Sequence, residues 1–152
     1  MWFLLACGPP APLAPDPSTV ATPPGTQLAD VVSVRVGGSE GAYEFDVGVR
    51  SPDLDCTRYA NWWEVIRPDG SLVYRRVLNH SHADEQPFIR DGGPIAVSAS
   101  EQLIVRAHLH PNGYGGAALV GSALAGFTPD TVALGFAASL ARSEPQPTEC
   151  WF

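Results

Sequence analysis

Lysine is absent from this sequence of 152 residues, and all nine basic residues are arginine. Without lysine the protein cannot use a Schiff-base nucleophile, a phosphate-loop lysine or a Ser–Lys hydrolase pair. Codon bias in a GC-rich genome is a sufficient explanation for the missing lysine. The 16 acidic residues give a formal net charge of −7. This acidic balance excludes a nucleic-acid interface, which requires a basic face.

Charged residues are also few, at 16%, whereas hydrophobic residues make up 45% of the sequence. This composition excludes a disordered chain and a coiled coil. A chain of this length is expected to form one domain with its own hydrophobic core. The G-x-S-x-G motif of serine hydrolases is missing as well, and no catalytic residue is identified.

Cysteine is scarce, and the first of the three ends an apolar stretch, Leu4-Leu5-Ala6-Cys7. This stretch resembles the lipobox of bacterial lipoproteins. The resemblance implies cleavage of a signal peptide before Cys7 and attachment of a diacylglycerol to its sulfur. Residues 1–6 would then be part of the signal peptide. Either translation starts upstream of Met1, or Cys7 belongs to the remnant of an ordinary signal.

Residues 8–26 follow as a proline-rich segment that contains seven of the fifteen prolines. Such a segment extends at about 3.1 Å per residue, and therefore over roughly 60 Å. A lipid-anchored protein needs a spacer of this kind to hold its domain away from the membrane, and a proline-rich tail on a soluble protein is the alternative. We expect a lipidated tether over 7–27 and a folded domain over 28–152, in the outer membrane or periplasm of a bacterial envelope.

Two cysteines remain, Cys56 and Cys150. An exported compartment is oxidising, so these two residues predict a single disulfide bond. In the chain-entropy model, closing a loop of this length with a disulfide would stabilise the folded domain by about 4–5 kcal/mol. Two buried free thiols are the alternative.

The domain is predicted to be all-β, because hydrophobic and polar residues alternate in segments separated by turns. About seven strands favour an immunoglobulin-like antiparallel β-sandwich. Gly92-Gly93-Pro94 is interpreted as a break, and Thr128-Pro129-Asp130 as a turn or helix start. One short helix is possible over 133–142. The expected strands cover 32–36, 43–49, 61–66, 71–78, 95–98, 103–110 and 117–124.

Histidine forms a distinctive pattern, because all four residues lie in two H-x-H pairs, His80 with His82 and His108 with His110. Side chains two residues apart on a strand point to the same face. On neighbouring strands the two pairs would offer four nitrogen ligands, which suits Zn²⁺ or Cu²⁺. Glu85 could replace one of the histidines.

Arginines accompany both pairs if the strands continue unbroken: Arg76 shares a side with the first pair, and Arg106 shares a side with the second. Permanent positive charges disfavour a cation nearby. The same cluster would suit an anionic ligand such as a carboxylate, sulfate or phosphate. The remaining interpretation is a polar patch in which these side chains pair with Asp and Glu.

His80, His82, Glu85 and Gly92 also resemble part of the first cupin motif, which supplies metal ligands in a jelly-roll. The resemblance implies a metalloenzyme with a deep barrel mouth lined by histidine. His108 and His110 would have to serve as the second cupin motif.

Aromatic residues provide further candidates for ligand binding. Trp62 and Trp63 are neighbours on an expected strand and face opposite ways, so one is expected in the core. The other could lie at the surface and stack on a sugar ring, or be covered by a loop. Tyr114 lies in a glycine-rich turn that could form one wall of a cleft.

The stretch from Cys56 to Gly116 resembles predicted bacterial envelope proteins that carry no assigned activity. We therefore expect a lipid-anchored, non-enzymatic binding or structural module. Its expected partners are the membrane and an envelope protein, a carbohydrate or a small anion. A metal-binding protein is the first alternative, and a cupin-like metalloenzyme the second.

Overall fold

Strands make up most of the regular structure in residues 28–152, the part of the chain that the computed structural model describes. The lipobox-like Cys7 and the tether 7–27 lie outside the described residues. The elements are β1 (Asp30–Ser39), β2 (Ala42–Arg50), β3 (Tyr59–Ile66), β4 (Leu72–Val77), β5 (Phe88–Ile95), β6 (Leu103–His110), β7 (Ala118–Ser122), β8 (Gly126–Asp130) and a 3-10 helix, η1 (Ala138–Arg142).

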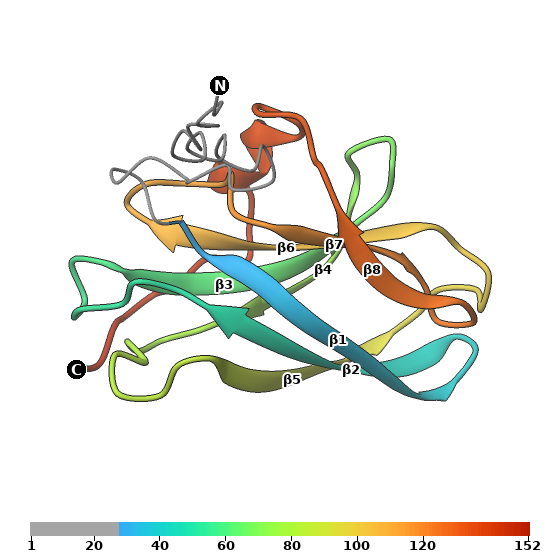
Figure 1. Ribbon diagram of the computed structural model, residues 1–152, viewed down its shortest axis with the longest axis horizontal. Coiled ribbons are helices and arrows are strands. Elements are labelled where there is room, and N and C mark those ends of the chain that lie inside the picture. The colour runs from blue at the N-terminus through green and yellow to red at the C-terminus, as the bar shows by residue number, and fades with distance from the viewer. Residues whose placement is uncertain (1–27) are drawn as a thin grey trace, which may run out of the picture.

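The strands form two antiparallel sheets that lie one above the other (Figure 1). One sheet has three strands in the order β1-β2-β5, and the other has five in the order β4-β3-β6-β7-β8. The chain crosses between the sheets after β2, after β4 and after β5. The all-β prediction is therefore confirmed, with eight strands in a sandwich-like arrangement.

Alternation along β3 divides its side chains between the two faces of the five-stranded sheet. Trp63 and Val65 lie in the main core together with Phe45 of β2 and Phe88 of β5, and all four side chains are fully buried. Removing this apolar surface from water is the main stabilising force of the fold.

The alternate residues of β3 point away from that core and are covered by the chain that follows β8. We call residues 131–150 the C-terminal segment. Ile66 packs here with Ile104 of β6, and Phe136 and Leu140 of the C-terminal segment lie against them. Both faces of the sheet are thus covered, which explains why all eight residues of β3 are buried.

Two turn predictions are wrong, and both involve proline. Gly92-Gly93-Pro94 lies inside β5, and Thr128-Pro129-Asp130 lies inside β8. Each of these strands is at the edge of its sheet. A proline lacks the N–H group that a central strand needs, but an edge strand has one side without a partner and tolerates it.

The helix expected over 133–142 is present only as η1, a 3-10 helix without buried residues. Residues 28–152 contain no helix that is long and apolar enough to cross a membrane.

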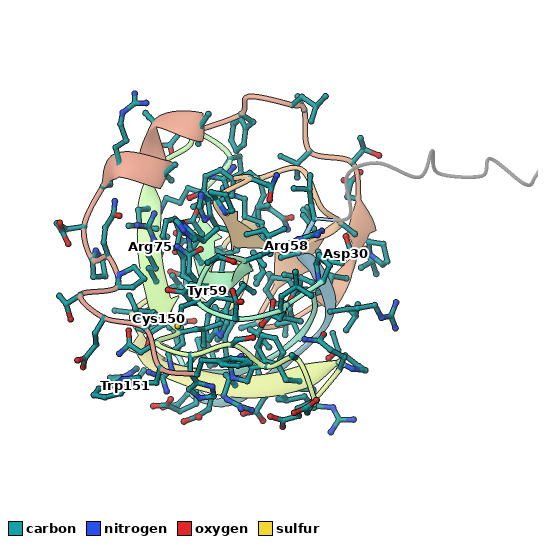
Figure 2. The ribbon with its side chains drawn as sticks, turned by 90° about the vertical axis from the view of Figure 1, so that its left-hand side faces the viewer. Asp30, Arg58, Tyr59, Arg75, Cys150 and Trp151 are labelled. Atoms are coloured by element: carbon teal, nitrogen blue, oxygen red, sulfur yellow. A yellow bond between two sulfur atoms is a disulfide. The ribbon has the colours of Figure 1, made fainter. Side chains whose placement is uncertain are left out.

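The predicted disulfide is confirmed. Cys56 and Cys150 are bonded, with their Cα atoms 5.7 Å apart and 94 positions apart in the sequence. Figure 2 labels Cys150 and Trp151 at one edge of the domain. The bond ties the end of the C-terminal segment to the turn that precedes β3.

Gly92 allows the two sheets to approach each other at the indole of Trp63. A Cβ atom placed on Gly92 would lie 2.7 Å from two carbons of that indole and 2.8 Å from the ring of Tyr74. Gly37 of β1 is a matched control, because a Cβ atom there would meet nothing within 4 Å.

We predict that Gly92→Ala lowers the free energy of unfolding by about 1–3 kcal/mol, because the buried Trp63 ring must shift. Gly37→Ala should change it by less than about 1 kcal/mol. Urea unfolding of both variants measures the difference. Equal stabilities would contradict the close approach of Trp63 to β5.

Candidate functional site

A carboxylate lies at the centre of the outer face of the five-stranded sheet. Glu64 of β3 is fully buried and is paired across the sheet with Arg75 of β4 and Arg106 of β6. Arg75 contacts one carboxylate oxygen at 2.6 Å, and Arg106 contacts the other at 2.8 Å. The three side chains form a buried Arg–Glu–Arg triad. Its two guanidinium groups carry two positive charges and its carboxylate only one negative charge, so the triad has an excess of one positive charge.

The two arginines bind the C-terminal segment as well. Arg106 donates to the carbonyl oxygens of Phe136 at 2.6 Å and Ala137 at 3.0 Å. Arg75 donates to the carbonyl oxygens of Leu140, Ser143 and Pro145. Because these carbonyl dipoles point their negative ends at the guanidinium groups, they offset the excess positive charge.

Aromatic rings cover the triad. The guanidinium carbon of Arg75 lies 4.2 Å from the ring centroid of Trp62, and that of Arg106 lies 3.6 Å from the ring centroid of Tyr114. Trp62 Nε1 donates a hydrogen bond of 3.2 Å to the Tyr114 hydroxyl. Cations over aromatic faces are attracted most strongly where water is excluded, as it is here.

His108 completes this cluster. Its ring is stacked on Trp62 with the centroids 4.0 Å apart, and its Nδ1 lies 2.6 Å from Oδ1 of Asn61. An amide oxygen only accepts hydrogen bonds, so Nδ1 carries the proton. Burial, together with the charges of Arg75 and other nearby cations, lowers the pKa of His108 to about 4. The imidazole is therefore neutral at pH 7.

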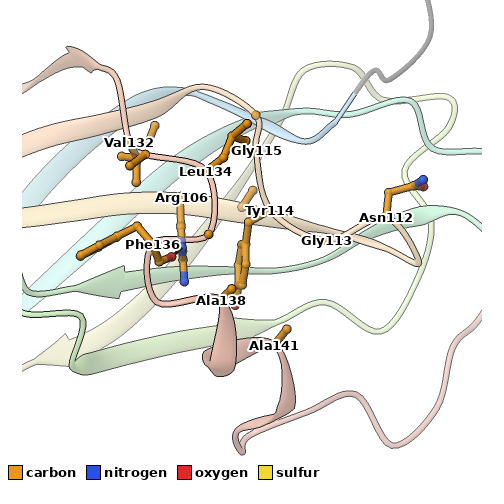
Figure 3. A pocket seen from close by; sticks show the side chains of 15 residues that line it. Arg106, Asn112, Gly113, Tyr114, Gly115, Val132, Leu134, Phe136, Ala138 and Ala141 are labelled. Atoms are coloured by element: carbon orange, nitrogen blue, oxygen red, sulfur yellow. Dashed lines mark hydrogen bonds between the residues drawn. The ribbon is translucent and has the colours of Figure 1, made fainter.

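A cavity of about 250 Å³ lies beside the triad, between β6, the turn that contains Tyr114, and the C-terminal segment. Figure 3 shows Arg106 and Tyr114 side by side, with Phe136 of the C-terminal segment next to Arg106. Most other lining residues are glycine or alanine. The cavity can accommodate a small neutral group.

The cavity is poorly suited to acid–base catalysis. Arg106 uses its guanidinium to bind Glu64 and two carbonyl oxygens. Burial and the charge of Glu64 raise the pKa of Tyr114 to about 12, so its phenol keeps its proton at neutral pH. A general acid or base works best with a pKa near the operating pH, and the phenol of Tyr114 does not meet this condition.

The two histidine pairs are in different places. His108 belongs to the cluster around Trp62, whereas His80 and His82 follow the end of β4 and lie beside Trp151. β4 ends at Val77, so the strand does not continue unbroken to His80 and His82. The pairs are therefore not on neighbouring strands as the sequence suggested.

The expected metal site is not assembled. Within residues 28–152, no three His, Cys, Asp or Glu side chains are grouped so that they could hold a metal ion. The core between the two sheets is filled by packed side chains, of which Trp63 is the largest. The histidine-lined barrel mouth that a cupin requires is therefore not part of this fold.

The other expected site residues are also placed by the structure. Trp63 is in the core, and Trp62 is only 1% exposed, so of the two alternatives for Trp62 the covered side chain is found and the surface platform for a sugar is not. Trp62 is buried because the C-terminal segment, which Arg75 and Arg106 hold in place, covers this face of the sheet. Arg76 lies apart from the triad and donates from Nε to the carbonyl oxygen of Asp91 on β5. Glu85 is exposed and bound to Arg90.

Sequence reasoning identified Arg106 and Tyr114 but missed Glu64 and Arg75. One signal was available, because Glu64 interrupts the apolar run Trp62-Trp63-Glu64-Val65-Ile66 in a strand that is otherwise buried. A carboxylate in such a run requires a cationic partner. Which arginine provides it depends on the strand register, and that is a property of the folded sheet.

We predict that Glu64→Gln lowers the free energy of unfolding by about 3–5 kcal/mol, because two buried guanidinium groups lose their counter-charge. Glu101→Gln is the control, since it changes an ion pair with Arg67 that is partly exposed and worth less than about 1 kcal/mol. Chemical denaturation measures both. A similar, small loss in the two variants would contradict the structural role of the triad.

We also predict that stability decreases in mild acid because of His108. Its pKa is about 4 in the folded domain and about 6.5 in the unfolded chain. Between these values the unfolded chain binds a proton that the folded domain does not. Stability present at neutral pH is therefore lost as the pH falls from 6.5 to 4, by up to about 3 kcal/mol.

His108→Gln tests this dependence, because glutamine can still donate to Asn61 but does not titrate. Urea unfolding at pH 7 and at pH 4.5 should show a smaller loss of stability in the variant than in the parent protein. The carboxylates titrate in both proteins and cancel in this comparison. An identical loss in the two proteins would refute the assignment.

Comparison with known proteins identifies a protein that is similar in sequence to this chain. A protein described as a "Putative lipoprotein" from the archaeon Halomicrobium mukohataei is 36% identical over 93 residues. The aligned part is 60% of this chain and 46% of the relative, so this chain spans about half of the relative's length. No family model matches the sequence. No solved structure matches it either.

Proposed function

We propose that this protein is an exported, lipid-anchored protein whose β domain is a non-enzymatic binding module. The observation that carries the proposal is the similarity to an archaeal protein described as a lipoprotein. It agrees with the lipobox-like pattern that ends at Cys7. A thioether-linked lipid on Cys7 would then hold the domain at a membrane surface.

The disulfide supports export. Cys56 and Cys150 are bonded, and such bonds persist in oxidising compartments outside the cytosol. The relative comes from an archaeon, so we propose a prokaryotic cell envelope in general rather than a bacterial outer membrane in particular.

Binding is favoured over catalysis by the state of the buried polar groups. Glu64 is fixed between two arginines, and His108 has a pKa of about 4. Tyr114 has a pKa of about 12. The two arginines hold the C-terminal segment on the sheet, and His108 and Tyr114 are not poised to exchange protons at neutral pH.

The strand order supports an immunoglobulin-like domain. If β1, β2 and β5 correspond to strands A, B and E, then β4-β3-β6-β7 corresponds to C′-C-F-G. The order of strands within each sheet and the crossings between sheets agree with this assignment. β8 extends the second sheet by one strand. Domains of this architecture present binding surfaces at their ends and edges.

The anchor is tested on protein isolated from its native cells. We expect a peptide containing Cys7 to exceed its amino-acid mass by a lipid, and the protein to partition into the detergent phase of a phase-separation assay. Cys7→Ser should move to the aqueous phase. Cys150→Ser, which removes a cysteine assigned to the disulfide, should stay in the detergent phase. A lipid that persists in Cys7→Ser would overturn the proposed anchor.

A further inference from the structure

A groove of about 470 Å³ lies between the loop that follows β4 and the residues after Cys150. We call it the terminal groove, and its main lining residues are His80, His82, Asp84, Glu85, Trp151 and Phe152. Its volume lies within the range of roughly 300–1,000 Å³ that is usual for small-molecule sites. None of its lining residues belongs to the cavity beside Arg106.

Trp151 is exposed but fixed in position. Its side chain lies at the outer edge of the domain (Figure 2), and the residue is 60% exposed. The backbone N–H of Trp151 donates a hydrogen bond of 2.7 Å to the carbonyl oxygen of Asn79, and the residue forms a β-bridge with His80. The preceding residue is held by the disulfide. These contacts hold the backbone of Trp151, and its indole and the neighbouring Phe152 form an exposed aromatic surface. Exposed apolar patches mark interaction sites.

His82 lies at the floor of the groove, where its hydrogen-bonding groups are unused. Its side chain is 1% exposed, is stacked on Phe88 and lies against the tilted ring of His80. Neither ring nitrogen has a hydrogen-bond partner within residues 28–152. The nearest carboxylate oxygen, on Asp53, is 3.9 Å from Nδ1, which is too far for a hydrogen bond. Buried polar groups are normally paired, so such an imidazole points to a ligand group.

The imidazole of His82 is neutral at pH 7. Burial is the main cause, with contributions from Arg90 and His80, and together they lower its pKa to about 4. Nearby Asp53 and Glu85 act in the opposite direction. A neutral imidazole offers one donor and one acceptor. A hydroxyl group, which both donates and accepts, is its natural complement.

The charges at the groove disfavour an anionic ligand. Asp84 and Glu85 both line it, and Glu85 is bound to Arg90 through two contacts, the shorter of 2.8 Å. The Arg90 contact lowers the pKa of Glu85, which stays ionised. Asp84 is exposed, and its carboxylate can accept hydrogen bonds from hydroxyl groups.

A neutral sugar combines the properties that the groove would recognise. A pyranose ring has an apolar face of C–H groups that stacks on an indole, and a rim of hydroxyl groups that donate and accept. We propose that the terminal groove binds neutral carbohydrate, with one sugar ring against Trp151 and its hydroxyl groups bonded to Asp84 and His82. This inference rests on the proposed function as a binding module and names its ligand class.

Isothermal titration of the full-length protein with neutral hexasaccharides tests the inference, using cellohexaose, maltohexaose, mannohexaose and N-acetylchitohexaose. We expect at least one to bind. Trp151→Ala should weaken that binding at least tenfold, and Asp84→Asn should weaken it several-fold. Leu134→Ala removes another large exposed apolar side chain, from outside the groove, and should bind like the parent protein.

Three outcomes would overturn the inference: no binding of any of the four sugars at millimolar concentration, unchanged binding by Trp151→Ala, or tighter binding of an anionic hexagalacturonate than of every neutral sugar. An intact Cys56–Cys150 bond and unaltered urea unfolding confirm that each variant is folded. The lipid on Cys7 is measured separately, so a domain that binds no sugar but carries the lipid refutes only this inference.

Discussion

The buried charge of Glu64 is the constraint on which the outer half of this domain depends. A carboxylate inside a sheet is stable only with a counter-charge, and the register of β3 with its two neighbours supplies one arginine from each side. Two guanidinium groups carry more positive charge than one carboxylate can balance, so further hydrogen-bond acceptors are required. The carbonyl groups of the C-terminal segment meet this need, and an irregular segment thereby becomes a fixed layer of the fold.

This arrangement separates structural from accessible polar groups. Trp62, His108 and Tyr114 look like ligand-binding residues in the sequence, yet they form the packing around the triad. Trp151 and Phe152, which follow the C-terminal segment, are exposed instead. The same C-terminal segment therefore covers the outer face of the five-stranded sheet and places Trp151 at the terminal groove.

The sequence predicted most strands of the core, because a period of two is visible along them, but it expected a strand at 95–98 where β5 covers Phe88–Ile95. It failed where proline lies in an edge strand, as at Pro94 and Pro129, since proline has the same local signature in a turn. The C-terminal segment has no periodicity, and its place on the sheet is set by carbonyl groups that every residue possesses. For the same reason the sequence could not decide between an exposed and a covered Trp62, whereas the Cys56–Cys150 bond followed from counting cysteines.

The disulfide changes what a protease can do to this domain. Its two cysteines are 94 positions apart, so a single cut anywhere between them leaves the two pieces covalently joined. A nicked domain would keep Trp151 attached to the part of the chain that contains β1 and β2. Loops such as the one around Leu124, which is exposed, can therefore be cleaved without release of either piece.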